Sequence, residues 1–196
     1  WNCRGYRRKR GALTQYLSTH TQRSDAIANQ ETNCAPNVPG YETYAQNTIR
    51  GDTPRVAALV AKHIPLIEHT MDKNGDIPHV LLELLPQKRG ETSLFIMNTF
   101  DNIFSDSIRI ARPRENTLLI VGDFNAAHPA WCYEHETVKG RKLATTIPRK
   151  QLTLPTEPDS PTTLRNSVNR DTSPDLTLLR PPPAEETSGA LSPLAQ

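Results

Sequence analysis

The sequence has little of several features that would place it in a common class of protein. Its three cysteines, Cys3, Cys34 and Cys132, are widely spaced and form no Cys-x-x-Cys pair, which argues against a zinc site and against a disulfide framework. No apolar run approaches the roughly 18 residues that crossing a membrane requires. The formal net charge is only +2. Any surface that binds nucleic acid through positive charge must therefore be local.

The chain is also lean in apolar residues, which account for 36% of its 196 positions, and it contains 17 prolines. This length suits one domain, and this composition favours a loop-rich fold of modest stability. The last residues are rich in Pro, Ala, Ser and Glu and show no apolar period. We therefore expect a single domain over residues 1–179 and a disordered tail over residues 180–196.

Apolar spacing predicts a chain that alternates between strands and helices. Ala12, Leu13, Tyr16 and Leu17 fall on one face of a helix that begins in a basic run. Two extended stretches flank a turn that contains glycine, so they should pair as an antiparallel hairpin. The hairpin strands are 80–85 and 92–98; further strands are expected over 26–28, 56–61, 117–121, 151–154 and 175–179, and further helices over 100–111 and 139–147, the last stopped by Pro148.

The sharpest local feature is the stretch that ends in Gly122, Asp123, Phe124 and Asn125, directly after an apolar strand. Strand alternation predicts that Asp123 and Asn125 point the same way. A carboxylate beside a neutral amide suits hydrolysis, because the carboxylate can orient an attacking water while the amide holds a phosphate oxygen. An ordinary strand-to-turn transition also uses Gly, Asp and Asn, so this stretch alone leaves both interpretations open.

Three further polar residues stand next to predicted strands or turns. Glu31 follows the strand over 26–28, Asn2 precedes the basic run, and Asp175 begins the last strand. Magnesium prefers one or two carboxylates together with water and substrate oxygens. Taken singly, Glu31 fits a solvated loop, and Asn2 and Asp175 fit turn or capping positions. Their order along the chain is more specific than any one of them.

In that order the chain resembles the endonuclease domain of arthropod-type non-LTR retrotransposons, a branch of the endonuclease/exonuclease/phosphatase superfamily. The resemblance runs from Trp1 to about Leu179 and rests on a few short stretches. These are Trp1-Asn2-Cys3-Arg4-Gly5, Asn29-Gln30-Glu31-Thr32, Val38-Pro39-Gly40-Tyr41, Val121-Gly122-Asp123-Phe124-Asn125-Ala126, His128-Pro129-Ala130-Trp131, Lys139-Gly140-Arg141 and residues 170–178.

The resemblance implies a four-layer α-β-β-α sandwich with two packed mixed β-sheets. It implies that Asn2 and Glu31 hold a divalent metal, Mg²⁺ with Mn²⁺ as the alternative. Asp123 would activate or align the attacking water, and Asn125 would contact the scissile phosphate. Asp175 would orient a histidine. The implied partner is DNA, with no membrane, and the implied location is intracellular, in the nucleus for a working retrotransposon endonuclease. No oligomeric state is predicted.

The sequence departs from the family in three places. The family's C-terminal Ser-Asp-His does not occur, and all six histidines precede Asp175. The family's Tyr-Ser-Pro-Pro after the hairpin is missing, which we interpret as a deletion that removes the tyrosine. The strand expected before Trp1 is absent, so Asn2 should lie on a loose end. We therefore expect a copy truncated at both ends, with a fold incomplete at both ends and weak or no activity.

Two other functions remain open. The chain could be a non-catalytic nucleic-acid-binding remnant whose phosphate contacts come from Arg7, Arg8, Lys9 and Arg10. A solvated helix start explains the same basic run equally well. A third alternative is another branch of the superfamily that acts on lipid or sugar phosphates.

Overall fold

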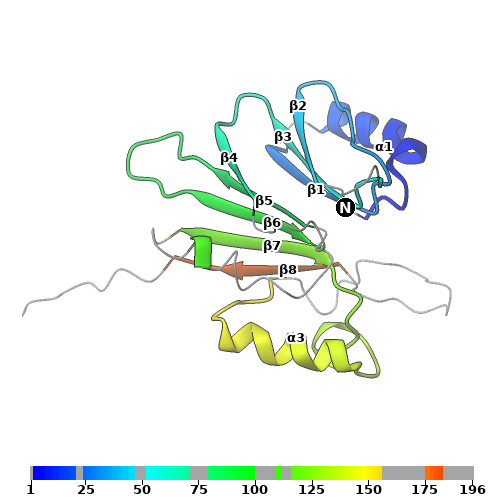
Figure 1. Ribbon diagram of the computed structural model, residues 1–196, viewed down its shortest axis with the longest axis vertical. Helices are drawn as coiled ribbons and strands as arrows, with labels where there is room; N and C mark the ends of the chain where they lie inside the picture. The colour runs from blue at the N-terminus through cyan, green and yellow to red at the C-terminus, as the bar shows by residue number, and fades with distance from the viewer. Residues whose placement is uncertain are drawn as a thin grey trace, which may run out of the picture.

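The computed structural model describes residues 2–20, 24–46, 52–70, 79–99, 109–111, 116–155 and 175–182. These residues form four layers: helix α1 (Tyr6–Thr19), a three-stranded sheet, a five-stranded sheet and helix α3 (Val138–Arg149) (Figure 1). The α-β-β-α order of the layers confirms the predicted fold class. No helix in these residues is long and apolar enough to cross a membrane.

The small sheet contains β1 (Ala26–Gln30), β2 (Tyr41–Ala45) and β3 (Val56–Ala61) in the order β1-β3-β2. Both pairs of strands are antiparallel, and β3 is buried along its whole length because it lies in the middle. A parallel bridge between Asn2 and Gln30 adds the start of the chain to the outer edge of β1. The strands predicted over 26–28 and 56–61 are confirmed.

The large sheet contains β4 (Leu66–His69), β5 (His79–Leu84), β6 (Leu94–Thr99), β7 (Thr117–Asp123) and β8 (Asp175–Arg180), in that spatial order. The predicted antiparallel hairpin is the β5–β6 pair. Strands β6 and β7 run parallel and the other neighbours run antiparallel, so this sheet is mixed. The carboxyl ends of β6 and β7 and the start of β8 therefore meet at one edge.

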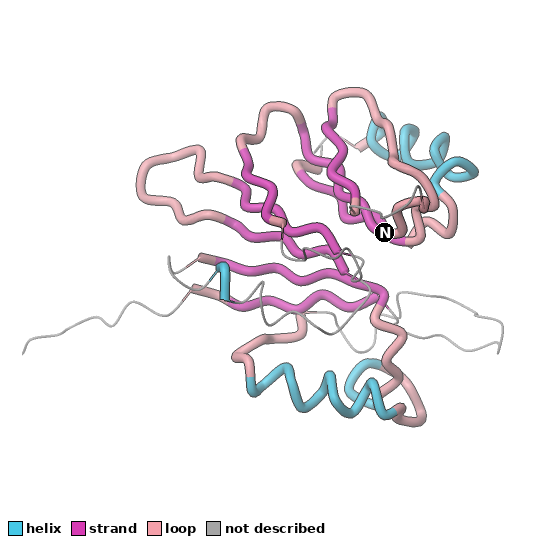
Figure 2. The backbone as a smooth tube through the Cα atoms, in the orientation of Figure 1, coloured by secondary structure: helices cyan, strands magenta, loops and turns pink. Residues whose placement is uncertain are grey.

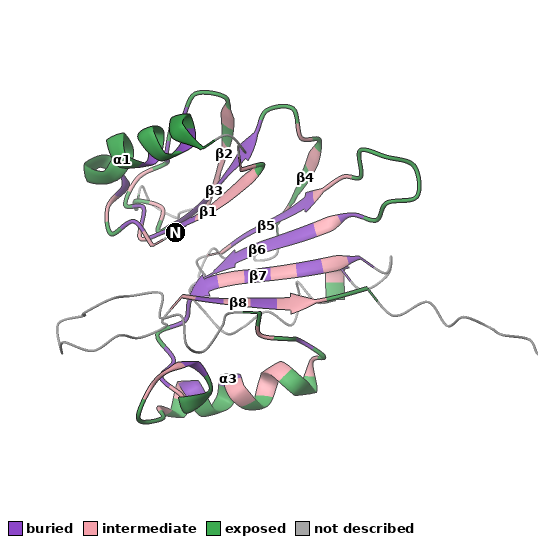
Figure 3. Cartoon of the chain, turned by 180° about the vertical axis from the view of Figure 1, so that it is seen from behind, coloured by how far each residue is buried: buried purple, intermediate pink, exposed green. Residues whose placement is uncertain are grey.

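Three apolar clusters hold the layers together. Leu13 and Leu17 of α1 pack with Leu59 of the small sheet. The cluster between the sheets is built from one alanine, two valines and one leucine: Ala58, Val60, Val80 and Leu82. The large sheet packs against α3 through bulkier groups, among them Phe95, Met97, Phe124, Trp131 and Leu143. Figure 3 shows the outward faces of both helices as exposed.

Several sequence-based expectations differ from the structure in detail. Helix α3 continues through Pro148 to Arg149, because a proline in the last turn removes only one backbone donor near an end that is already fraying. The strand predicted over 151–154 is reduced to a single bridge between Thr153 and Leu179. Strands β2 and β4 and the short 3₁₀ turn over Pro129–Trp131 were not predicted (Figure 2).

Other expectations fall largely on residues outside the described ranges. Of the helix predicted over 100–111, only residues 109–111 are described, and they are helical. The predicted tail lies outside the described residues from position 183 onward. Strand β8 itself ends at Arg180, one residue beyond the predicted domain boundary.

Candidate active site

The first described residues tie the small sheet to the large sheet. The Cys3 amide donates to the Gln30 carbonyl over 3.0 Å, and the Gly5 amide donates to the Glu31 carbonyl over 2.7 Å. From the same segment, Asn2 Nδ2 donates to Asp123 Oδ2 over 2.7 Å. The expectation that Asn2 lies on a loose end is therefore wrong. Backbone pairing and a side-chain hydrogen bond both hold it at the site.

Asp123 and Asp175 form the part of the site that belongs to the large sheet. They are direct partners in the register of β7 and β8, at the edge where these strands meet. Asp123 is 4% exposed, and within the described part of the chain its Oδ1 has no hydrogen-bond partner. The strand can approach its neighbour here because residue 122 is glycine: a Cβ at Gly122 would lie 2.3 Å from the Thr99 carbonyl oxygen.

Negative charge accumulates at this end of the molecule. The pKa of Asp175 is raised from its ordinary value of 3.8 to about 6, first by burial and then by the neighbouring charges of Asp123 and Glu31. The Arg4 guanidinium acts in the opposite direction and lowers this pKa. The charges of Asp123 and Glu31 thus both reach Asp175, as expected for residues of one common site.

Glu31 reaches the site from the loop that follows β1. Its backbone is in the left-handed region, with φ of 52°, and its side chain is half-buried. The loop is fixed on the far side by Thr32, whose amide donates to the Arg55 carbonyl and whose hydroxyl donates to the Pro54 carbonyl over 2.6 Å. The position of this carboxylate is therefore set by backbone hydrogen bonds rather than by a strand of its own.

Asn125 does not follow the predicted alternation. Strand β7 ends at Asp123, Phe124 turns into the core with no exposed surface, and Asn125 adopts a left-handed backbone with φ of 45°. The residue is exposed, unlike Asp123, which is buried at the end of the strand. The alternation argument fails because it holds only while the strand continues.

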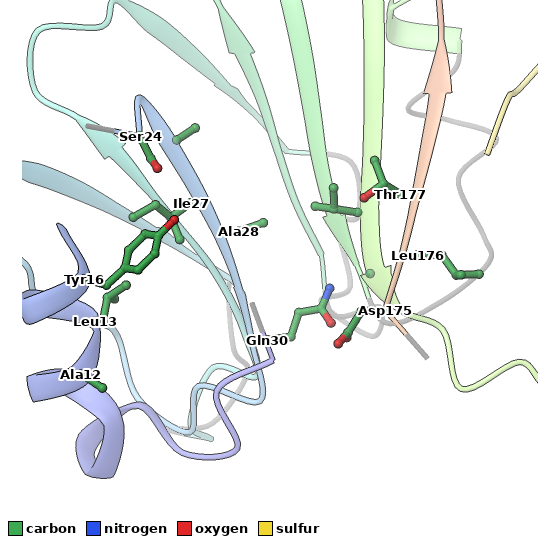
Figure 4. Close-up of a pocket in the computed structure, with 13 residues that line it drawn as sticks. Ala12, Leu13, Tyr16, Ser24, Ile27, Ala28, Gln30, Asp175, Leu176 and Thr177 are labelled. Carbon is green, nitrogen blue, oxygen red and sulfur yellow. The ribbon is translucent and has the colours of Figure 1, made fainter. Parts of the chain in front are cut away.

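A cavity of about 790 Å³ opens beside the acidic group, between α1, β1, β7 and β8. Gln30 and Asp175 line it and point toward one another in Figure 4. The rest of the lining is mainly apolar and includes Ala12, Leu13, Tyr16, Ile27, Ala28 and Leu176. Ala12 and Tyr16, which the sequence placed on one helix face with Leu13 and Leu17, both line this opening, and Tyr16 is 51% exposed.

The predicted basic residues Arg7, Arg8, Lys9 and Arg10 are all exposed on the first turns of α1. The basic residue whose charge reaches the acidic group is Arg4, which sequence reasoning counted in the basic run without giving it a role at the site. Sequence reasoning also missed Asn98, a buried polar residue in β6. The signal was a single amide in an otherwise apolar strand.

The oxygens gathered here fit a hard divalent cation. No three His, Cys, Asp or Glu side chains within the described ranges are grouped as a ready-made metal site. Asn2, Glu31 and the unpartnered Oδ1 of Asp123 instead supply two carboxylates and an amide. That is the small protein contribution that Mg²⁺ and Mn²⁺ accept when water and substrate oxygens complete the shell.

The fold and this end-of-sheet site define a member of the endonuclease/exonuclease/phosphatase superfamily. A family model described as "Endonuclease-reverse transcriptase" matches residues 92–192, just over half of the chain, and the chain belongs to that family. No curated protein matches the sequence.

Solved structures with the same fold are distant in sequence. The chain is similar to the endonuclease domain of TRAS1, a telomere-specific non-LTR retrotransposon (TM-score 0.71, 16% identity, 91% of this chain and 81% of that one). It is also similar to the catalytic domain of Xenopus laevis APE2 (TM-score 0.62, 17% identity, 92% and 81%). A third is TDP2 from C. elegans (TM-score 0.53, 14% identity, 87% and 58%).

Proposed function

We propose that this domain is a metal-dependent phosphodiesterase that nicks DNA, as the endonuclease of a retrotransposon would, and that its turnover is low. The observation that carries the proposal is the 2.7 Å hydrogen bond from Asn2 to Asp123. It joins a residue beside β1 to the end of β7 and so brings Glu31 and Asp123 to one edge of the sandwich. Acting on chromosomal DNA would place the protein in the nucleus.

Asp123 is the residue we assign to the attacking water. Its Oδ2 accepts from Asn2, which leaves Oδ1, the oxygen without a partner in the described residues, to accept a hydrogen bond from water and align it. Its burial at 4% exposure keeps this interaction strong. The exposed amide of Asn125 follows directly and is the group assigned to the phosphate.

Asn2 and Glu31 are the residues that would hold a divalent metal. Bound there, Mg²⁺ or Mn²⁺ would supply positive charge that stabilises the charge developing on the phosphate. The effect of Asp123 and Glu31 on the pKa of Asp175 favours a cation at this edge, because a cation would offset the negative charge gathered there.

Low turnover is expected from the groups that the sequence lacks. Asp175 lies beside Asp123, yet all six histidines of these 196 residues precede it, so none of them stands where the family's histidine would. A single donor to the transition state is worth roughly 2.7–4 kcal/mol in comparable hydrolytic sites, and the family's tyrosine is absent as well. When two such groups act together, losing both costs less transition-state stabilisation than the sum of the two separate losses.

Nicking of supercoiled plasmid in the presence of Mg²⁺ or Mn²⁺ tests the proposal. We expect slow, metal-dependent nicking that Asp123→Asn abolishes, whereas Asp52→Asn, a change at an exposed aspartate, leaves it unchanged. Metal-dependent nicking that survives Asp123→Asn would overturn the assignment.

The alternative function is a non-catalytic nucleic-acid-binding remnant. The exposure of Arg7, Arg8, Lys9 and Arg10 favours it. Four positive charges near the N-terminus of a helix repel one another and interact unfavourably with the helix dipole, and a bound anion such as a DNA phosphate would relieve both effects. Salt-sensitive DNA binding without any metal-dependent nicking would select this alternative.

A further inference from the structure

A buried asparagine joins the two sheets next to the candidate site. Asn98 of β6 has no exposed surface. Its Nδ2 donates to two backbone carbonyls of the small sheet, Asn29 of β1 and Ala57 of β3, each over 2.9 Å. Its Oδ1 accepts from Gln30 Nε2 over 3.1 Å. Both amide protons and one acceptor position are therefore used across the interface between the sheets.

These contacts differ in kind from the rest of that interface. Elsewhere the sheets meet through Ala58, Val60, Val80 and Leu82, whose dispersion contacts have no preferred direction. Hydrogen bonds are directional and lose strength steeply when they bend, so the bonds of Asn98 fix the relative position of the sheets at this edge.

Asn98 is adjacent to both halves of the site. On one side, Gln30 directly precedes Glu31, and its carbonyl accepts from the Cys3 amide next to Asn2. On the other side, Thr99 follows Asn98 and its carbonyl faces Gly122, the residue before Asp123. One side chain thus connects the segment that carries Glu31 to the segment that carries Asp123.

The side chain of Gln30 is held in one orientation by its hydrogen bond to Asn98. Because its Nε2 is held by Asn98, its Oε1 is left without a hydrogen-bond partner within the described residues, although Gln30 is only 3% exposed. The side chain lines the cavity and points toward Asp175 (Figure 4). Loss of Asn98 would free this amide to rotate and would leave Glu31 less firmly placed.

We propose that Asn98 is a positioning residue for the candidate metal site and sets the spacing between Glu31 and Asp123. The inference rests on the proposed function, because it assumes that Asn2 and Glu31 hold a divalent metal. Residues that orient metal ligands without touching the metal typically change metal affinity by about 10–100-fold when replaced.

The chain offers a matched control at the other end of the same pair of strands. Asn116 is also buried, at 2% exposure, and its Oδ1 accepts from the Ser93 amide at the start of β6, far from Gly122 along the strand. Asn116→Ala removes another buried asparagine, which lies directly before β7 and away from the site. It should lower the melting temperature as Asn98→Ala does, without changing the site.

Mn²⁺ binding to the full chain, measured by calorimetry, tests the proposal in wild type, Asn98→Ala and Asn116→Ala. We expect Kd to rise about 10–100-fold for Asn98→Ala and less than about twofold for Asn116→Ala. If Asn98→Ala does not fold, Gln30→Met, which removes only the side-chain link, should raise Kd in the same direction. Equal Kd values for wild type and the folded variant would overturn the positioning role.

A double-mutant cycle with Glu31→Gln separates positioning from general destabilisation. If Asn98 acts through Glu31, Asn98→Ala should weaken Mn²⁺ binding in the wild-type background and change it less than about twofold in the Glu31→Gln background. An equal loss in both backgrounds would contradict the proposal. Failure of the wild-type chain to bind Mn²⁺ would instead refute the proposed function, so the two failures are distinguishable.

Discussion

The half of the molecule built on the large sheet and the half built on the small sheet both carry polar site residues, but different kinds of structure hold these residues in place. Asp123 and Asp175 stand at the ends of paired strands whose outer face packs on Trp131 and the rest of the α3 layer. Asn2 and Glu31 stand in loops held by backbone hydrogen bonds, with only α1 behind them. From this difference in packing we expect the half that would align the water to be the more rigid one.

Removing a large side chain from each half should sharpen this comparison most. Trp131 is 1% exposed and its indole N–H donates to the Ala126 carbonyl over 2.6 Å, so Trp131→Ala should cost about 3–5 kcal/mol. Leu13→Ala in the small half should cost about 2–3 kcal/mol. Urea unfolding measures both. A larger cost for Leu13→Ala would reverse our ranking of the two halves.

A pair of glycine substitutions probes the halves with the same chemical change. Gly122→Ala places a Cβ 2.3 Å from the Thr99 carbonyl, which should destabilise the fold by about 1–3 kcal/mol and separate β6 from β7 at the site. Gly11→Ala meets nothing within 4 Å in the middle of α1 and should stabilise it by about 0.5–1 kcal/mol. Thermal melts of both variants test the contrast, and destabilisation by Gly11→Ala would contradict it.

Asp175→Asn should stabilise the metal-free protein at neutral pH. A carboxyl whose pKa is raised to about 6 in the folded state favours folding at low pH, and that contribution is lost as the pH rises from about 4 through 6. The shift corresponds to at most about 3 kcal/mol, which solvent screening at a half-buried group reduces to about 1–2 kcal/mol. Urea unfolding at pH 4 and pH 7 in EDTA should show the gain only at pH 7.

Replacing Arg7, Arg8, Lys9 and Arg10 with Ala should have the smallest effect on stability, a few tenths of a kcal/mol, because all four side chains are exposed. These replacements should change the salt dependence of DNA binding more than they change its sequence preference. Each lost phosphate contact lowers the slope of log K against log salt by about 0.9. An unchanged slope would remove these residues from the DNA-binding surface.

Sequence patterns located the strands whose apolar runs are continuous, such as 56–61, which is buried along its whole length, and 117–121, which is buried at alternate positions. They missed β2 and β4, which lie at sheet edges and contain no fully buried residue, so no apolar run marks them. Edge strands owe their conformation to their neighbours rather than to their own side chains.

The same division applies to the site. Asp123 was found because it ends an apolar strand, and Glu31 because it follows one. Strand alternation does not extend to Asn125, because β7 ends at Asp123 and Phe124 is buried in the core. Asn98 and Gln30 could not be paired from sequence, since 68 positions separate them and only the packing of two sheets brings them together.

The two ends of the described chain lie at opposite ends of the large sheet. Asn2 contacts Asp123, whereas β8 begins opposite Asp123 and carries Arg180 to the far end of the sheet, opposite Leu118. A fusion partner or surface anchor joined in front of Asn2 would therefore stand at the mouth of the acidic site and crowd incoming DNA. One joined after residue 182 would be attached at the opposite pole, and it is the attachment to choose for immobilised binding and nicking assays.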